Sequence, residues 1–267
     1  MMRQAKFCSI LVAMAAVLIA VLMTTPGHAQ SAVGWWTFDD VSNLGKDSSK
    51  SGNNLTNDGD VSYAAGGQFG GALSLDGDGD MLTGNPFSAV PTGNEQYSLS
   101  AWVKTTTDGS RGIVGWGEFA NTLDSNAFRL GDTDKLNNYW WGVGMELVSP
   151  VNLLDDNWHH VASTYDGTTA TLWVDGGSIG STTPGVIASQ ATNFSIGRTC
   201  PPCGGGEFFN GLLDDVAIFD YALSSDQITA LHTGANTPGN LPEPSTGLLV
   251  VIALASLAAV RGRGPKK

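Results

Sequence analysis

The sequence predicts an all-β fold, a two-sheet antiparallel sandwich of the jelly-roll type with one short helix near its C-terminal end. Short segments with alternating apolar and polar residues, separated by Gly, Asp and Asn, run from residue 33 to residue 220. Such segments are typical of strands joined by turns. Only one later segment carries clear helix signals, which favours a sandwich over a mixed fold. Residues 30–236 also fit the roughly 200 to 250 residues that one all-β domain can occupy.

The clearest strand is predicted over residues 97–104, where Leu99, Ala101 and Val103 share one face. Similar runs lie at residues 158–165, 169–175 and 212–219. A turn with Gly167 joins two of these runs, and Asp175-Gly176-Gly177 begins the next reversal. This part of the chain is therefore predicted to be an antiparallel meander.

One helix is predicted directly after the last strand. Ser224 and Gln227 have the spacing of a capping box, in which each side chain bonds the other residue's backbone amide. Ile228 and Leu231 form a short apolar stripe, and Gly234 is placed to end the helix.

Residues 1–29 have the features of a secretory signal peptide. Arg3 and Lys6 give a positive start, residues 10–23 are apolar, and small residues surround a cleavage point near Ala29. An uncleaved N-terminal anchor is the alternative, although the apolar run is shorter than the ~20 residues of a typical span. We therefore expect an exported chain that begins at Gln30.

Residues 237–267 form a linker and a C-terminal tail, which consists of Pro242-Glu243-Pro244, an apolar run at 247–260 and a basic end. As a helix this run is about 21 Å long, shorter than the ~30 Å hydrocarbon core, so we expect transient membrane contact. The basic end should stay cytoplasmic. This order of features resembles the PEP-CTERM sorting signal, which implies processing by an exosortase in a Gram-negative bacterium. The resemblance implies a location at the cell surface or in the extracellular matrix.

The exported part of the chain is strongly acidic. Between residues 30 and 241 it has seven basic and 24 acidic residues, a formal net charge of −17. Such a surface repels nucleic acid and anionic lipid. The acidic excess serves solubility, or some of the carboxylates hold calcium, which prefers oxygen ligands.

Two of the three cysteines, Cys200 and Cys203, lie in a Cys-Pro-Pro-Cys sequence. An exported pair this close can form a local disulfide. Zinc would need two further ligands at matching spacing, and a thioredoxin-like site would need a helix where Gly204 follows instead. We predict a disulfide that closes a loop, with a free dithiol as the alternative.

Five motifs in order resemble those of LamG-like, concanavalin A-like jelly-roll domains, and together they cover residues 35–231. They are Trp-Trp-Thr-Phe-Asp-Asp (35–40) with the loop at 47–53, Phe-Gly-Gly-Ala-Leu-Ser-Leu-Asp-Gly (69–77) with Asp80, the strand at 97–104, Asn-Trp-His-His-Val-Ala (157–162) with Trp-Val-Asp-Gly (173–176), and Phe-Asn-Gly-Leu-Leu-Asp-Asp-Val (209–216) with Tyr-Ala-Leu-Ser (221–224). The resemblance implies a jelly roll, a fold that carries lectins, carbohydrate-binding modules, adhesion domains and glycoside hydrolases.

The same resemblance implies a structural cation, Ca²⁺, between the first and closing strands. The matching positions are Asp39 and Asp214, with Asp215 as the alternate ligand. Two neighbouring carboxylates repel each other unless a cation neutralises them. The alternative is that these aspartates cap turns or pair with Lys or Arg.

A second acidic segment, Asp76-Gly-Asp-Gly-Asp80, begins like an EF-hand loop. Met81 replaces the turn glycine and Phe87 replaces the bidentate Glu, so it fails that comparison. We interpret it as a hairpin turn between residues 73–75 and 81–82.

Sugar binding would use aromatic faces beside amides and carboxylates, because pyranose rings present C–H surfaces and hydroxyls. The best cluster is Tyr139 and Trp140, with Trp116 as a neighbour. Alternation along a strand means that only one of Trp140 and Trp141 can face a given side.

No enzyme is predicted. Jelly-roll glucanases resemble one another in carrying both catalytic glutamates on one strand, as Glu-x-Asp-x-x-Glu, whereas the four glutamates between residues 30 and 241 are scattered singly. A Ser-His-Asp hydrolase would need a Gly-x-Ser-x-Gly elbow, and the sequence has none. The predicted function is an exported domain that binds carbohydrate or a surface protein. The alternatives are a polysaccharide hydrolase or lyase and a purely structural matrix protein.

Overall fold

The structure is a computed structural model that describes residues 31–84, 90–200 and 206–242. The predicted signal peptide, most of the sorting signal and Cys203 lie outside these ranges. Residues 31–241 form one compact unit.

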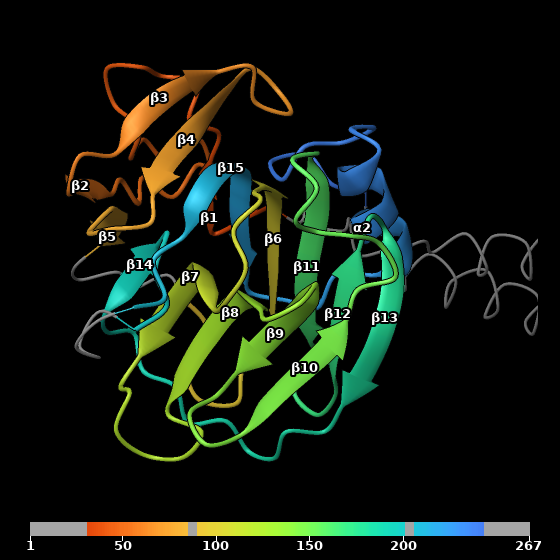
Figure 1. The fold of residues 1–267 in the computed structure, drawn as a ribbon. Helices are drawn as coiled ribbons and strands as arrows, with labels where there is room; N and C mark the ends of the chain where they lie inside the picture. Colours follow the sequence, from red (N-terminus) through yellow and green to blue (C-terminus); the bar gives the residue numbers. More distant parts are fainter. Residues whose placement is uncertain (1–30, 85–89, 201–205, 243–267) are drawn as a thin grey trace, which may run out of the picture. The chain divides into compact units, whose positions relative to one another are not determined.

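Eight antiparallel strands form sheet A, and β15 lies near its centre (Figure 1). The order is β13 (Gly177–Thr182), β12 (Ala170–Val174), β11 (His159–Tyr165), β6 (Tyr97–Lys104), β15 (Asn210–Phe219), β4 (Gly71–Asp76) and β3 (Ser62–Ala65), while β1 (Gly34–Trp36) pairs with β15. The predicted meander is confirmed, since β11 pairs with β12 and β12 with β13.

Seven antiparallel strands form sheet B, which faces sheet A (Figure 1). The order is β10 (Gly144–Val148), β9 (Lys135–Tyr139), β8 (Ser125–Gly131), β7 (Arg111–Gly117), β14 (Phe194–Ile196), β5 (Met81–Gly84) and β2 (Thr56–Asp58). The predicted all-β jelly-roll sandwich is confirmed.

The main core lies between the two sheets. Leu99 and Val103 from β6 are fully buried with Phe128 and Leu130 from β8 in one apolar cluster. Alternation along each strand places the intervening side chains on the outer faces of the sandwich. Those outer faces carry the candidate sites.

Helix α2 (Ser225–His232) covers part of the outer face of sheet A, and Ile228 and Leu231 pack there in a second apolar cluster with Phe219. The predicted capping box is present, because Gln227 N donates to Ser224 Oγ and Ser224 N donates to Gln227 Oε1. Within the described parts of the chain, no helix is long and apolar enough to cross a bilayer.

Two details differ from the sequence prediction. The turn between Asp76 and Asp80 does not close a hairpin, because β4 belongs to sheet A and β5 to sheet B. Residues 237–241, assigned to the linker, pack on the domain: Ala32 N donates to Pro238 O at 3.1 Å, and Leu241 is buried.

Candidate functional site

A bulge in β15 determines which acidic side chains reach the outer face of sheet A. Asp214 pairs with Trp102 and Ala217 with Ser100, so Asp215 and Val216 together oppose a single residue of β6. Leu213 and Val216 both point into the main core. The extra residue therefore places Asp214 and Asp215 on the same outer face, as bulges often do when they re-aim a side chain.

Asp214 and Asp39 hold the loop at residues 67–71. Phe69 N donates to Asp214 Oδ2 at 2.9 Å, and Gly71 N donates to Asp39 Oδ1 at 2.7 Å. Gly70 has φ +81° and lies against the Asp39 carboxylate, where a side chain would not fit. Each aspartate thus has a structural role as an acceptor of backbone hydrogen bonds.

Asp214 is fully buried, and burial raises its pKa to about 8, with the charges of Asp215 and Asp39 adding to the rise. Burial also raises the pKa of Asp215 to about 6. Trp35 Nε1 opposes that rise by donating to Asp215 Oδ1 at 2.6 Å. None of these three aspartates forms an ion pair among the described residues.

The charge of Asp39 is near enough to raise the pKa values of Asp214 and Asp215, but the three carboxylates do not converge as a metal centre. Within the described ranges, one set of three possible ligand residues has its ligand atoms within 4.8 Å of one another, and it is a different set. Calcium binding by Asp39 and Asp214, with Asp215 as the alternate, stays a prediction.

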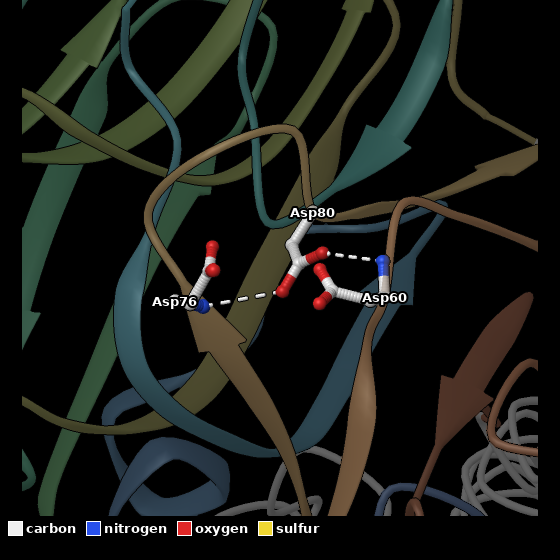
Figure 2. Close-up of side chains that lie close together, drawn as sticks. All are labelled: Asp60, Asp76 and Asp80. Atoms are coloured by element: carbon white, nitrogen blue, oxygen red, sulfur yellow. Dashed lines mark hydrogen bonds between the residues drawn. The ribbon is translucent and has the colours of Figure 1, made fainter.

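That set is Asp60, Asp76 and Asp80 (Figure 2). The backbone amides of Asp60 and Asp76 donate to the two oxygens of Asp80 at 2.8 and 3.2 Å. Burial raises the pKa of Asp80. These hydrogen bonds explain the position of Asp80 without an ion. They also stabilise the turn by which the chain passes from β4 in sheet A to β5 in sheet B.

The outer face of sheet B carries a polar row across three strands. Arg129 of β8 pairs with Asn137 of β9, and Asn137 pairs with Glu146 of β10. Asn137 Nδ2 donates to Glu146 Oε2 at 3.1 Å, and Arg129 forms an ion pair with Glu207. The hydrogen bond from Lys135 is the largest cause of a lowered pKa at Glu146.

An aromatic strip of three half-buried rings, Tyr139, Trp141 and Phe119, adjoins this row. Tyr139 lies 6.3 Å from Trp141, which lies 6.0 Å from Phe119, both between ring centroids. The Arg129 guanidinium carbon is 5.0 Å from the centroid of the Tyr139 ring. Among the described residues, buried Arg129 Nε and Asn137 Oδ1 have no hydrogen-bond partner.

Tyr139 is partly exposed, so its predicted contact with a glycan stays a prediction, whereas the other two candidates are core residues. Trp140 and Trp116 are fully buried, so neither ring can stack on a glycan, and these two assignments are wrong. Trp140 Nε1 donates to Tyr97 Oη at 2.9 Å and Trp116 Nε1 to Pro91 O at 3.2 Å. Alternation predicted that one of Trp140 and Trp141 faces outward, and the structure shows that it is Trp141.

Cys200 is buried. Its predicted partner Cys203 lies outside the described residues, so the Cys200–Cys203 loop disulfide stays a prediction.

A family model described as the concanavalin A-like lectin/glucanases superfamily matches residues 75–229. Among solved structures, domain 4 of AbnA, a GH43 extracellular arabinanase from Geobacillus stearothermophilus in complex with arabinotriose, is similar with a TM-score of 0.60 and 21% identity. The similarity covers 77% of this chain and 100% of that domain. No curated protein sequence matches.

Two toxin domains share the fold. The binding domain of Paraclostridial Mosquitocidal Protein 1 is similar with a TM-score of 0.61 and 14% identity over 77% of this chain and 52% of that one. The binding domain of botulinum neurotoxin serotype G is similar with a TM-score of 0.58 and 13% identity, over 76% of this chain and 51% of that one. The chain therefore spans about half of each toxin domain.

The raised pKa of Asp214 predicts a pH dependence of stability. Its pKa is higher in the folded state than in the unfolded state, so the folded state binds the proton more tightly, and stability falls as pH rises from about 4 to 8. One such group contributes a slope of at most about 1.4 kcal/mol per pH unit. The free energy of unfolding, measured with denaturant between pH 5 and 8, should lack this pH-dependent contribution in Asp214→Asn. The exposed control Asp132→Asn should keep it. An identical pH dependence in Asp214→Asn and wild type would contradict the assignment.

The predicted calcium site is tested by thermal unfolding with excess Ca²⁺ and with a chelator. An ion that binds only the folded state stabilises it by about 2.7 kcal/mol at a concentration one hundred times Kd. The prediction requires a higher Tm with Ca²⁺, a rise that is lost in Asp39→Asn and retained in Asp80→Asn. Loss in Asp80→Asn alone would move the ion to Asp60, Asp76 and Asp80, and no rise in wild type would contradict calcium binding.

Proposed function

We propose that this chain, which belongs to the concanavalin A-like lectin/glucanase superfamily, is an exported, non-enzymatic domain that binds carbohydrate through the outer face of sheet B. The observation that carries the proposal is the aromatic strip of Tyr139, Trp141 and Phe119 beside the polar row of Arg129, Asn137 and Glu146.

This combination suits a sugar for two physical reasons. A pyranose or furanose ring offers C–H groups that pack on an aromatic face, and Tyr139 and Trp141 are half-buried, so each ring is held in place with part of its surface accessible. The ring hydroxyls need donors and acceptors. The side chains of Lys135 and Glu146 are 33% and 41% exposed, so an ammonium donor and a carboxylate acceptor are accessible at this face.

The comparison with the arabinanase domain supports a glycan as the ligand. That domain is matched over its whole length and was solved with arabinotriose. The toxin binding domains show that the same fold also serves in binding domains of other proteins. A surface protein is the second class of partner in the proposal.

The electrostatics of the face favour binding over hydrolysis. A glycosidase needs one carboxylic acid with a raised pKa as proton donor. Glu146 is paired with Lys135 at 3.0 Å and its pKa is lowered, and Glu207 is paired with Arg129. A polysaccharide-degrading enzyme is the alternative, and release of reducing ends from a polysaccharide that binds would establish it.

The location follows from the two terminal segments of the sequence. The proposal places the domain at the cell surface or in the extracellular matrix of a Gram-negative bacterium, after export and recognition of the tail by an exosortase, with transient membrane contact through that tail. The acidic surface argues against a nucleic-acid partner. Ca²⁺ is kept in the proposal as a structural ligand, with the chelator measurement above as its test.

Substitution of Tyr139, the ring of the strip that lies beside Arg129, tests the proposed face. Tyr139→Ala should weaken binding to a recognised polysaccharide about tenfold, because it removes one stacking surface. Tyr63→Ala is the matched control, since Tyr63 is a partly exposed tyrosine of sheet A. Affinity electrophoresis against a polysaccharide panel, with Tm measured for each variant, provides the readout. Equal retardation of Tyr139→Ala and wild type by every retarding polysaccharide would contradict the proposed site.

A further inference from the structure

A pocket on the other side of the sandwich, over the outer face of sheet A, has a different chemistry. Its volume is about 270 Å³, and its walls include Trp35 of β1, Trp102 of β6, His160 of β11 and Phe69 of the loop held by Asp214. The ring centroid of Trp102 lies 5.9 Å from that of Phe69, in an edge-to-face arrangement, and 5.3 Å from that of His160. Three aromatic side chains, Trp35, Trp102 and Phe69, thus contribute to a single small cavity.

Two carboxylates, those of Asp39 and Asp215, line the pocket. None of the lining residues is Lys or Arg. No lysine or arginine in the pocket lining therefore neutralises these carboxylates.

His160 does not supply the missing cation. It is fully buried, and burial lowers its pKa to about 3, so the imidazole is neutral. His160 Nε2 lies 2.9 Å from Ser100 Oγ, and among the described residues its Nδ1 has no partner. A buried ring that borders the cavity therefore has an unused polar atom.

We propose that this pocket binds a small organic ammonium group, carried by an amino sugar with a free amine. The aromatic rings attract a cation through their faces, and the carboxylates of Asp39 and Asp215 form charge-assisted hydrogen bonds with it. Thr37, Ser100 and Asn236 in the walls serve the sugar hydroxyls. These hydroxyl and amide groups favour an amino sugar over a trimethylammonium headgroup, which has no N–H or O–H on its cationic end.

The size agrees with one sugar residue, because the volume is just below the roughly 300 Å³ at which pockets for larger ligands begin. This site is independent of the proposed glycan face, since its residues belong to sheet A and its covering loops. The two proposals can therefore fail separately.

Isothermal titration of the purified full-length protein with glucosamine tests the site. N-acetylglucosamine is the matched uncharged ligand, and choline provides an ammonium group without the sugar ring. We expect glucosamine to bind at least about tenfold more tightly than either, and Asp215→Asn to lose about tenfold in glucosamine affinity. In Asp215→Asn the side-chain carbonyl can still accept the hydrogen bond from Trp35, so the fold should persist, and its Tm is the check. Asp132→Asn is the control for a lost surface charge.

Equal binding of glucosamine and N-acetylglucosamine, or an unchanged affinity in Asp215→Asn, would overturn the proposal. Choline binding as tight as that of glucosamine would overturn the assignment to an amino sugar. The ammonium site and the predicted calcium site share Asp39, so the two assignments exclude each other. Displacement of glucosamine by Ca²⁺ would overturn the ammonium site, because the carboxylates would then be metal ligands. Retained polysaccharide binding by Asp215→Asn would leave the function of the Tyr139 face intact in each case.

Discussion

The extra residue in β15 is the constraint on which the outer face of sheet A depends. β4 pairs with β15 through Leu213, and β1 pairs with it from Val216 onward, so the bulge falls where neither strand continues. Asp214 and Asp215 lie in that interval, and their carboxylates accept hydrogen bonds from Phe69 N and Trp35 Nε1. A regular strand would have turned one of them into the apolar core, where an unpaired charge is strongly destabilising. The bulge thus explains three features together: the hydrogen bond that holds the loop at residues 67–71, the raised pKa values of Asp214 and Asp215, and the position of Asp215 in the pocket wall.

The two outer faces of the sandwich offer different chemistry. Sheet B presents rings and a row in which positive and negative groups are paired, as at Arg129 with Glu207 and Lys135 with Glu146. Such a face is electrically balanced and suits a neutral, hydroxyl-rich ligand. Sheet A presents carboxylates without basic partners beside aromatic walls, which suits a cation. A single fold therefore supports two separate binding proposals, and the charge pairing decides which ligand fits each face.

Much of the fold could be predicted from local pattern. Alternation of Leu99, Ala101 and Val103 identified β6, and the Ser224 and Gln227 pair identified the start of α2. Ordered motifs along the chain indicated the jelly roll. These features depend on neighbours within a few residues, which is why the sequence reveals them.

The sites depend on long-range pairing that local pattern does not contain. The bulge exists only relative to β6, more than one hundred residues earlier. Asp60 lies beside Asp76 and Asp80 where the chain crosses from β4 in sheet A to β5 in sheet B. Interpreting residues 76–80 as a hairpin turn did not predict this cluster. Trp140 and Trp141 follow the end of β9 and differ by one position, yet the first is buried in the core and the second is half-buried at the surface.

Carbohydrate binding at the outer face of sheet B is best tested by amide chemical-shift mapping during titration with a neutral oligosaccharide from a recognised polysaccharide. We expect shift changes centred on Asn137, Tyr139 and Trp141, with the amides around Asp215 unaffected. Binding that shifts other amides and leaves this face of sheet B unchanged would contradict it.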